Sequence, residues 1–171
     1  MSEYEIVAGG VDDAASMAAL HAAAFDEPWT AKAMTEILAM PGTYVLLATD
    51  ADVRFGNNGV SHGNIAGGPQ AGLSGFVIAR VAADEAEILT LAVDISKRGQ
   101  GLGRKLMEAA AARALASGAA ALFLEVADDN VAALALYERL GFVTMGLRPA
   151  YYARAGGSVA ARNMRLSLGK T

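Results

Sequence analysis

VDISKRGQGLG, at residues 93–103, is the stretch on which the predicted fold depends. It follows an apolar run at residues 88–93 that is typical of a buried strand, and an alanine-rich helical pattern begins at its end. The first backbone N–H groups of a helix have no partner inside the helix, and the positive end of the helix dipole lies behind them. Glycine has no Cβ, so such a loop can bend and an anion can approach its backbone closely. We therefore predict a strand, a glycine-rich loop and a helix N-terminus that bind a pyrophosphate group.

The spacing of the loop excludes two common phosphate-binding motifs. A P-loop requires GxxxxGK[ST], which the sequence lacks. A dinucleotide-binding GxGxxG motif counted from Gly99 would need a glycine where Arg104 stands. The order Arg98-x-x-Gly101-x-Gly103 instead resembles the acetyl-CoA loop of the GNAT superfamily of N-acetyltransferases, with Arg98 and Arg104 adding positive charge at its rim.

Length and composition limit the class of protein. A chain of 171 residues suits one domain with a sizeable core, so we expect a single domain over residues 1–171. Cysteine is absent, which excludes disulfides, thiol catalysis and thiolate metal sites, and we expect no metal. The net charge of −4 argues against non-specific nucleic-acid binding. No continuously apolar run reaches the roughly 18 residues of a membrane span. Glu3 and Glu5 stand where a signal peptide would be basic, so we expect a cytoplasmic protein without a membrane partner.

The pattern of apolar residues and breakers predicts seven strands and four helices. We expect strands at residues 4–7, 43–49, 73–82, 87–93, 121–126, 142–152 and 161–168. We expect helices that begin near residue 11, at residues 31–40, at residues 102–117 and between Asn130 and Gly141. The order β-α-α-β-β-β-α-β-α-β-β predicts an α/β fold with a mixed sheet and helices on both faces. The resemblance to the GNAT superfamily implies that this sheet is of the GNAT type and mostly antiparallel. Residues 50–72 are rich in glycine and poor in large apolar side chains, so we expect a mobile loop there.

A second motif supports the resemblance to the GNAT superfamily. Residues 130–142 read NVAALALYERLGF, which closely resembles the segment N-x-x-A-x-x-L-Y-x-x-x-G-F of that superfamily. With the glycine-rich loop, the resemblance is strong over residues 87–142 and looser elsewhere. Two motifs in the right order and at the right spacing are a specific signal.

Within the superfamily, the chain is similar to the RimI-type ribosomal-protein N-terminal acetyltransferases. The matching pieces are Pro28-Trp29-Thr30, residues 86–89, residues 124–126 with Tyr137, and Arg148 followed by Tyr151-Tyr152. Two departures concern the acceptor side: residues 50–72 are longer than the usual connection, and Pro149-Ala150 replaces more polar residues.

The resemblance implies a role for each residue of a site. Glu125 is implied as the general base, acting through water, and Tyr137 as the donor of a hydrogen bond or proton to the CoA sulfur. With ordinary pKa values of about 10 for a phenol and about 8.5 for a thiol, full transfer to the thiolate is uphill by about 2 kcal/mol. The backbone of Leu91 and Val93 would pair with the pantetheine arm, which Asn130 would hold. The implied acetyl-CoA residues are Leu91, Ala92, Val93, Arg98, Gly99, Gln100, Gly101, Leu102, Gly103, Arg104 and Asn130.

On the acceptor side the implied residues are Trp29, Glu87, Tyr151 and Tyr152. Glu87 is also the reserve candidate for the base. Other interpretations of these residue types remain open: Glu125 could cap a turn, Tyr137 could be a core aromatic, and Trp29 could be a packing anchor. His21, within the first predicted helix, is expected to lie at the surface or the edge of the core, and His62 is expected to be incidental.

Three functions are compatible with these residues. The first is acetylation of the N-terminal α-amine of a protein, for which a ribosomal protein is one candidate acceptor. The second is acetylation of a small amine or a lysine, and the third is a catalytically idle CoA-binding module. About a quarter of an α-amine with pKa 7.7–8.0 is neutral near pH 7.5, against roughly 0.1% of a lysine with pKa 10.4. A single carboxylate base is therefore adequate for an α-amine, which favours the first function.

Overall fold

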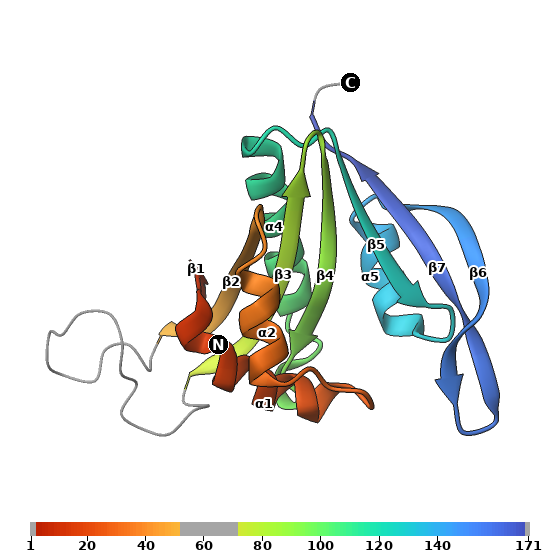
Figure 1. Cartoon of the computed structure of the whole chain (residues 1–171), viewed down its shortest axis with the longest axis horizontal. Coiled ribbons are helices and arrows are strands. Elements are labelled where there is room, and N and C mark those ends of the chain that lie inside the picture. The colour runs from red at the N-terminus through yellow and green to blue at the C-terminus, as the bar shows by residue number, and fades with distance from the viewer. Residues whose placement is uncertain (1–2, 52–71, 170–171) are drawn as a thin grey trace, which may run out of the picture. The chain divides into compact units, whose positions relative to one another are not determined.

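A computed structural model describes residues 3–51 and 72–169 of the chain. Within these residues the strands form one hydrogen-bonded sheet in the order β1-β2-β3-β4-β5-β7-β6 (Figure 1). The strands are β1 Tyr4–Ala8, β2 Thr43–Asp50, β3 Leu73–Ala82, β4 Glu85–Val93, β5 Ala121–Ala127, β6 Val143–Arg154 and β7 Gly157–Ser167. The helices are α1 Ala14–Ala24, α2 Ala31–Leu38, α4 Leu102–Ala116 and α5 Val131–Arg139, with short 3-10 helices η1 Val11–Asp13 and η2 Ile95–Lys97.

The direction of the strands agrees with the predicted fold class. β4 and β5 pair in parallel, whereas β1 with β2, β5 with β7, and β6 with β7 pair antiparallel. The α/β class and the mixed, mostly antiparallel sheet are therefore confirmed. The predicted mobile loop at residues 50–72 falls mainly outside the described residues, although Asp50 itself belongs to β2.

Most predicted boundaries lie within two residues of the observed ones, and the last hairpin is the main exception. β7 begins at Gly157 and not at residue 161, and β6 continues to Arg154. The ladder continues until Arg154 pairs with Gly157, so the glycines form the hairpin turn and do not separate two shorter strands. Backbone hydrogen bonds maintain this part of the ribbon although its side chains are exposed, which a hydrophobic pattern does not reveal.

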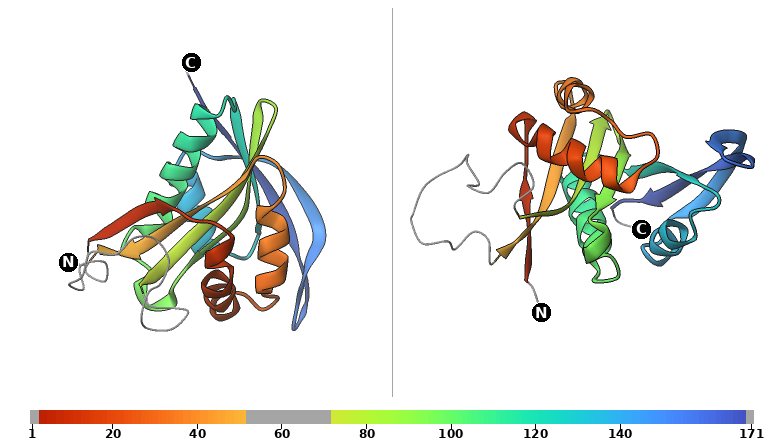
Figure 2. Two further views of the ribbon diagram at one scale, coloured as in Figure 1. Left: turned by 60° about the vertical axis from the view of Figure 1, so that its left-hand side comes forward. Right: turned by 90° about the horizontal axis from the view of Figure 1, so that it is seen from below.

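Contacts divide the chain into two compact units: Met1–Ala79 with Thr90–Ala110, and Arg80–Leu89 with Ala111–Thr171. In the first unit, α1 and α2 cover one face of the strands and the beginning of α4 covers the other (Figures 1 and 2). Phe76, Val77 and Ile78 of β3 are all 0% exposed, as expected for a strand with helices on both faces. The hydroxyl of Tyr44 in β2 donates to the carbonyl oxygen of Ala110 at 2.7 Å and fastens α4 to the strands.

In the second unit, β5 has one covered face and one open face. Leu122, Leu124 and Val126 are buried, whereas the residues that alternate with them are half-buried. Leu166 of β7 pairs with Leu122 and therefore lies on the covered face. A Cβ added at Gly141, the residue that follows the end of α5, would lie 3.4 Å from the Leu166 side chain. The end of α5 thus packs on the covered face of β5 and β7, and Glu125 belongs to the opposite face.

The β6–β7 ribbon has an irregularity at its middle. The register shifts between Arg148 and Tyr152, so the ribbon consists of a base that reaches Arg148 and a tip that begins at Tyr152. Ala150, within this bulge, has φ +51°, a left-handed conformation that costs a residue with a Cβ about 1 kcal/mol or more. The bulge bends the ribbon at the predicted acceptor-side segment.

Candidate functional site

The glycine-rich loop of the first unit bends at two of its glycines. Gly99 and Gly101 have φ values of +76° and +81°, in the left-handed region that favours glycine. A Cβ added at either position would meet no atom within 4 Å, so the space beside this backbone is open. The carbonyl oxygen of Gly101 accepts from the N–H of Lys105 at 3.0 Å as α4 begins. The loop therefore fits a pyrophosphate group in its backbone geometry and its open space.

The two arginines beside the loop have partners within the protein. The Arg98 Nε lies 3.4 Å from the carbonyl oxygen of Val93, and the Arg104 Nε pairs with the Glu108 carboxylate at 2.8 Å. The Arg104 side chain is 69% exposed, so this surface pair contributes roughly 1 kcal/mol or less. Rearranging either arginine toward an anion would therefore cost little.

The loop is fastened by residues that the sequence analysis did not single out. The hydroxyl of Tyr4 in β1 donates to the Gln100 Oε1 at 3.1 Å. Asp94 accepts from the backbone N–H of Ser96 at 2.8 Å and from its hydroxyl at 2.7 Å, and these bonds lower the pKa of the Asp94 carboxyl. Tyr4 and Gln100 are 96 residues apart, so no local pattern could have indicated this contact.

The predicted pantetheine-pairing segment lies at the end of β4. Leu91 and Val93 are half-buried and Ala92 is buried. The parallel ladder of β4 with β5 comprises Glu85, Ala86 and Glu87 and ends there, before Leu91. The backbone edge of β4 at Leu91 and Val93 is therefore not part of that ladder.

Both candidate bases belong to the second unit. Glu87 pairs with Phe123 in the β4–β5 ladder, and Glu125 alternates with Phe123 on the same face of β5. The Glu125 Oε1 lies 3.2 Å from a guanidinium nitrogen of Arg148, and its side chain is 28% exposed. The Glu87 carboxylate lies 3.8 Å from Arg80. Glu87 and Glu125 therefore share the open face, and Glu125 already holds a cation.

Three tyrosines of this unit form a chain of contacts that leads to Glu125 through Tyr152. Tyr151 and Tyr152 pack edge to face with ring centres 5.0 Å apart, and Arg148 lies over the Tyr151 ring at 4.6 Å. Burial, and then the nearby Glu125 charge, raise the pKa of the Tyr152 phenol. Tyr137 is 7% exposed, and burial together with Tyr152 raises its pKa to about 12. The structure thus brings Glu125, Arg148 and the tyrosine pair together and places Tyr137 within electrostatic range of Tyr152.

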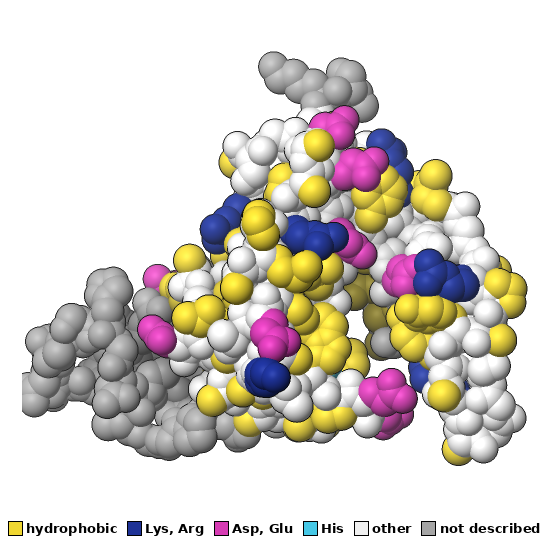
Figure 3. Space-filling model, viewed as in Figure 1, with side chains coloured by type: hydrophobic (Ala, Val, Ile, Leu, Met, Phe, Trp, Pro, Cys, Tyr) yellow, Lys and Arg dark blue, Asp and Glu magenta, His cyan; other side chains and the backbone are white. Residues whose placement is uncertain are grey.

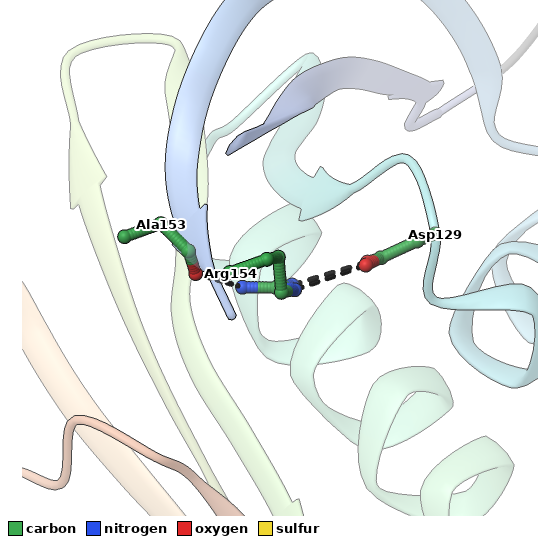
Figure 4. Close-up of polar contacts among 3 residues, drawn as sticks. All are labelled: Asp129, Ala153 and Arg154. Carbon is green, nitrogen blue, oxygen red and sulfur yellow. Dashed lines mark hydrogen bonds and ion pairs between the residues drawn. The ribbon is translucent and has the colours of Figure 1, made fainter. Parts of the chain in front are cut away.

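The turn between β5 and α5 is held by two arginines of the ribbon. Arg154 donates from Nε to the Asp129 Oδ2 at 2.9 Å and from a terminal nitrogen to Oδ1 at 3.1 Å (Figure 4). These bonds lower the pKa of the Asp129 carboxyl. Arg162 of β7 donates from its Nε and from a terminal nitrogen to one oxygen of Asp128, Oδ1. Acidic and basic side chains lie directly beside one another over these outer strands in Figure 3.

Asn130, predicted to hold the pantetheine arm, caps α5. Its Oδ1 accepts from the N–H of Ala133 at 3.2 Å, and its own side-chain N–H₂ group is a further donor. The cap uses one lone pair of this oxygen and does not use the amide nitrogen. The role of Asn130 toward a ligand stays a prediction.

Trp29 lies in the first unit, in the connection between α1 and α2. It is half-buried, and its backbone N–H donates to the Nδ1 of His21 at 3.1 Å. His21 is only 2% exposed, so a place at the surface is wrong, while its exposed and half-buried aromatic neighbours put it at the edge of the core. Its position one helical turn after Met17, on the apolar side of α1, was the available signal. The predicted slot between Trp29 and the tyrosine pair stays a prediction.

Two further observations concern metals and membranes. Within residues 3–51 and 72–169, no group of three His, Asp or Glu side chains is arranged to hold a metal ion. None of the helices in this described part combines the length and the apolar character of a membrane span.

Comparison with known proteins identifies the family. The sequence profile described as Acetyltransferase (GNAT) family matches residues 14–142. A [ribosomal protein bS18]-alanine N-acetyltransferase of Salmonella typhimurium is 38% identical over 114 residues, which cover 67% of this chain and 77% of that protein. The N-alpha-acetyltransferase RimI of Mycobacterium tuberculosis is 34% identical over 148 residues, covering 84% of this chain and 81% of that protein.

The solved structures lead to the same family. The crystal structure of the ribosomal-protein-S18-alanine N-acetyltransferase from Escherichia coli superposes with a TM-score of 0.81 at 28% identity, covering 99% of this chain and 96% of that one. The match covers 32% of the length of one curated relative and 81% of another. The chain therefore spans less than two thirds of the length of some relatives. The profile match, the relatives and the fold together show that this chain belongs to the GNAT family and is similar to its RimI-type members.

Proposed function

We propose that this chain transfers an acetyl group from acetyl-CoA to the N-terminal α-amine of a protein. The relatives named as alanine N-acetyltransferases of ribosomal protein bS18 make a ribosomal protein the first candidate acceptor. The observation that carries the proposal is the Glu125 carboxylate, which lies on the open face of β5 and holds the guanidinium of Arg148 at 3.2 Å. A carboxylate that pairs with one exposed cation can equally receive the ammonium group of a chain end.

The first unit would hold the cosubstrate. Acetyl-CoA supplies an acetyl group activated as a thioester. The backbone of Gly99 and Gly101, with open space beside it, would receive the pyrophosphate. Leu91 and Val93, beyond the end of the β4–β5 ladder, would offer backbone groups to the pantetheine arm.

The second unit would perform the proton transfers. Glu125 would remove a proton from the acceptor amine through water, and Glu87 on the same face is the alternative base. Tyr137 keeps its proton throughout the physiological pH range because burial raises its pKa to about 12. It can therefore donate a hydrogen bond to the sulfur as negative charge develops there.

A comparison of two peptides tests the proposal. One begins with a free alanine, and its twin carries an N-formyl group and an internal lysine. With acetyl-CoA, we expect kcat/KM for the free peptide to exceed that of the blocked twin by at least about a hundredfold, because far more of an α-amine is neutral at pH 7.5. Mass spectrometry locates the added acetyl group.

Each other outcome has a defined meaning. If the blocked twin is the better substrate, the acceptor is a lysine and the proposal is wrong. If neither peptide is acetylated but a small amine is, the chain is an acetyltransferase of another acceptor class. If acetyl-CoA binds and no acceptor reacts, the chain is a CoA-binding module.

A further inference from the structure

His21 connects three segments of the first unit through a single imidazole. Its Nε2 lies 3.1 Å from the Oγ1 of Thr90 in β4, and its Nδ1 accepts from the backbone N–H of Trp29 at 3.1 Å. The ring stacks on Phe25 with centres 4.1 Å apart and on Trp29 at 5.3 Å. Both ring nitrogens of this buried side chain are therefore engaged, and the ring stacks on two aromatic neighbours.

The contacts fix the tautomer of the ring. A backbone N–H can only donate, so the Nδ1 that receives the Trp29 N–H must carry a lone pair. In a neutral imidazole the proton is then on Nε2, which donates to the hydroxyl oxygen of Thr90. Burial lowers the pKa of His21 and keeps the ring in this neutral form.

The same residue holds the connection between α1 and α2 at two points. The backbone carbonyl of His21 accepts from the N–H of Phe25 at 2.9 Å as α1 ends, and its ring accepts from Trp29. Residues 25–28 of this connection are exposed, whereas Trp29 is half-buried against the ring. On its other side the imidazole is bonded to Thr90, which directly precedes Leu91. The ring therefore sets the position of Trp29 relative to β4.

We propose that His21 is a positioning residue for the acceptor, whose Nε2–H tautomer holds the Trp29-bearing connection against β4. The inference rests on the proposed function, because Trp29 serves the acceptor only if the chain acetylates a chain end. Loss of the imidazole should release the connection and weaken the binding of the acceptor peptide. It should leave acetyl-CoA binding unchanged, since the glycine-rich loop is fastened by Tyr4 and Asp94 and not by His21.

Three substitutions separate the two bonds of the ring. His21→Leu removes both bonds and keeps an apolar side chain. His21→Asn keeps a short side-chain oxygen that can accept from the Trp29 N–H. Thr90→Val removes only the partner of Nε2. Thr35→Val is its matched control, because the exposed Thr35 hydroxyl bonds only to the backbone of its own helix, at the Ala31 carbonyl oxygen.

The single tryptophan of the chain makes the readout direct. We expect His21→Leu to shift the Trp29 emission to the red and to raise its quenching by acrylamide. The acceptor KM should rise at least about tenfold, with the acetyl-CoA Kd unchanged within about twofold. His21→Asn should restore most of both properties, and Thr90→Val should give a smaller change than His21→Leu. Thr35→Val should behave as the wild type.

Two results would overturn the proposal. One is a folded His21→Leu variant with unchanged Trp29 emission and acceptor KM, and the other is an equal rise of the acceptor KM and the acetyl-CoA Kd. If His21→Leu does not fold, Thr90→Val and nitrogen NMR of the wild-type imidazole decide, and a proton found on Nδ1 refutes the arrangement. If the wild type acetylates no peptide, the proposed function fails, while the emission and NMR measurements still test the positioning by themselves.

Discussion

Substituting Tyr137 by phenylalanine removes one buried hydroxyl and keeps the ring, whose centre lies 5.7 Å from the centre of the Phe142 ring. The pKa of this phenol is about 12. Against a thiol of pKa about 8.5, the difference of about 3.5 makes full proton transfer to the CoA thiolate uphill by about 4.8 kcal/mol. The sequence alone, with an ordinary phenol pKa, predicts about 2 kcal/mol. In the proposed mechanism, burial therefore favours a hydrogen bond from Tyr137 to the developing thiolate over complete proton transfer.

This role sets the size of the expected loss. A hydrogen bond to a charged group contributes about 1.5–3 kcal/mol, which corresponds to a loss of roughly 10- to 150-fold in kcat for Tyr137→Phe. The loss should be nearly constant from pH 7 to 10, because a phenol with a pKa of about 12 stays protonated over that range. Steady-state kinetics at several pH values measure it, and calorimetry checks that acetyl-CoA still binds. A folded variant with wild-type kcat would reduce Tyr137 to a packing residue, and a loss that disappears near pH 10 would show that the phenol titrates there.

The remaining predictions concern the loop, the base and the buried histidine. Gly101→Val forces a branched side chain to adopt φ +81° beside the open cradle, so the acetyl-CoA Kd measured by calorimetry should rise at least about tenfold. Glu125→Gln should lower kcat/KM by roughly 10²–10⁴-fold while its matched control Glu87→Gln has a much smaller effect, and the reverse order would make Glu87 the base. Burial lowers the pKa of His21 below its ordinary value of about 6.5, so the unfolded chain binds its proton first as the pH falls. The contribution of His21 to the free energy of unfolding should be complete above pH about 6.5 and decline below it, and denaturant titrations of wild type and His21→Leu should converge as the pH falls.

Local patterns were sufficient for the elements and for the glycine-rich loop. Glycines at 99 and 101 indicated a loop that can bend sharply, and both adopt a positive φ in the structure. Thr30 and Asn130 were placed before helices, and both side chains cap them by accepting from Ala33 and Ala133. These features depend on residues within one turn of each other, so a short stretch of sequence is enough to predict them.

Contacts between distant segments could not be predicted in the same way. The bond from His21 to Thr90 joins residues 69 positions apart, and the pairing of Glu125 with Arg148 depends on the register of the β6–β7 ribbon. That register includes a bulge, which the alternation of buried and exposed side chains along a strand does not reveal. The sequence therefore indicated which charged and aromatic residues of the exposed ribbon are candidates for the site, but it did not indicate which residues they contact.

The bulge between Arg148 and Tyr152 divides the ribbon into two lengths of ladder that can open separately. The base is continuous with β5 through β7, whereas the tip is joined to the rest of its unit by the Arg154–Asp129 pair. Backbone amides of the tip should therefore exchange with deuterium sooner than those of the base, and added salt should widen the difference by screening the exposed pair. Because the tip can open while Arg148 remains beside Glu125, changes in the sequence of the hairpin can accumulate without moving the proposed base.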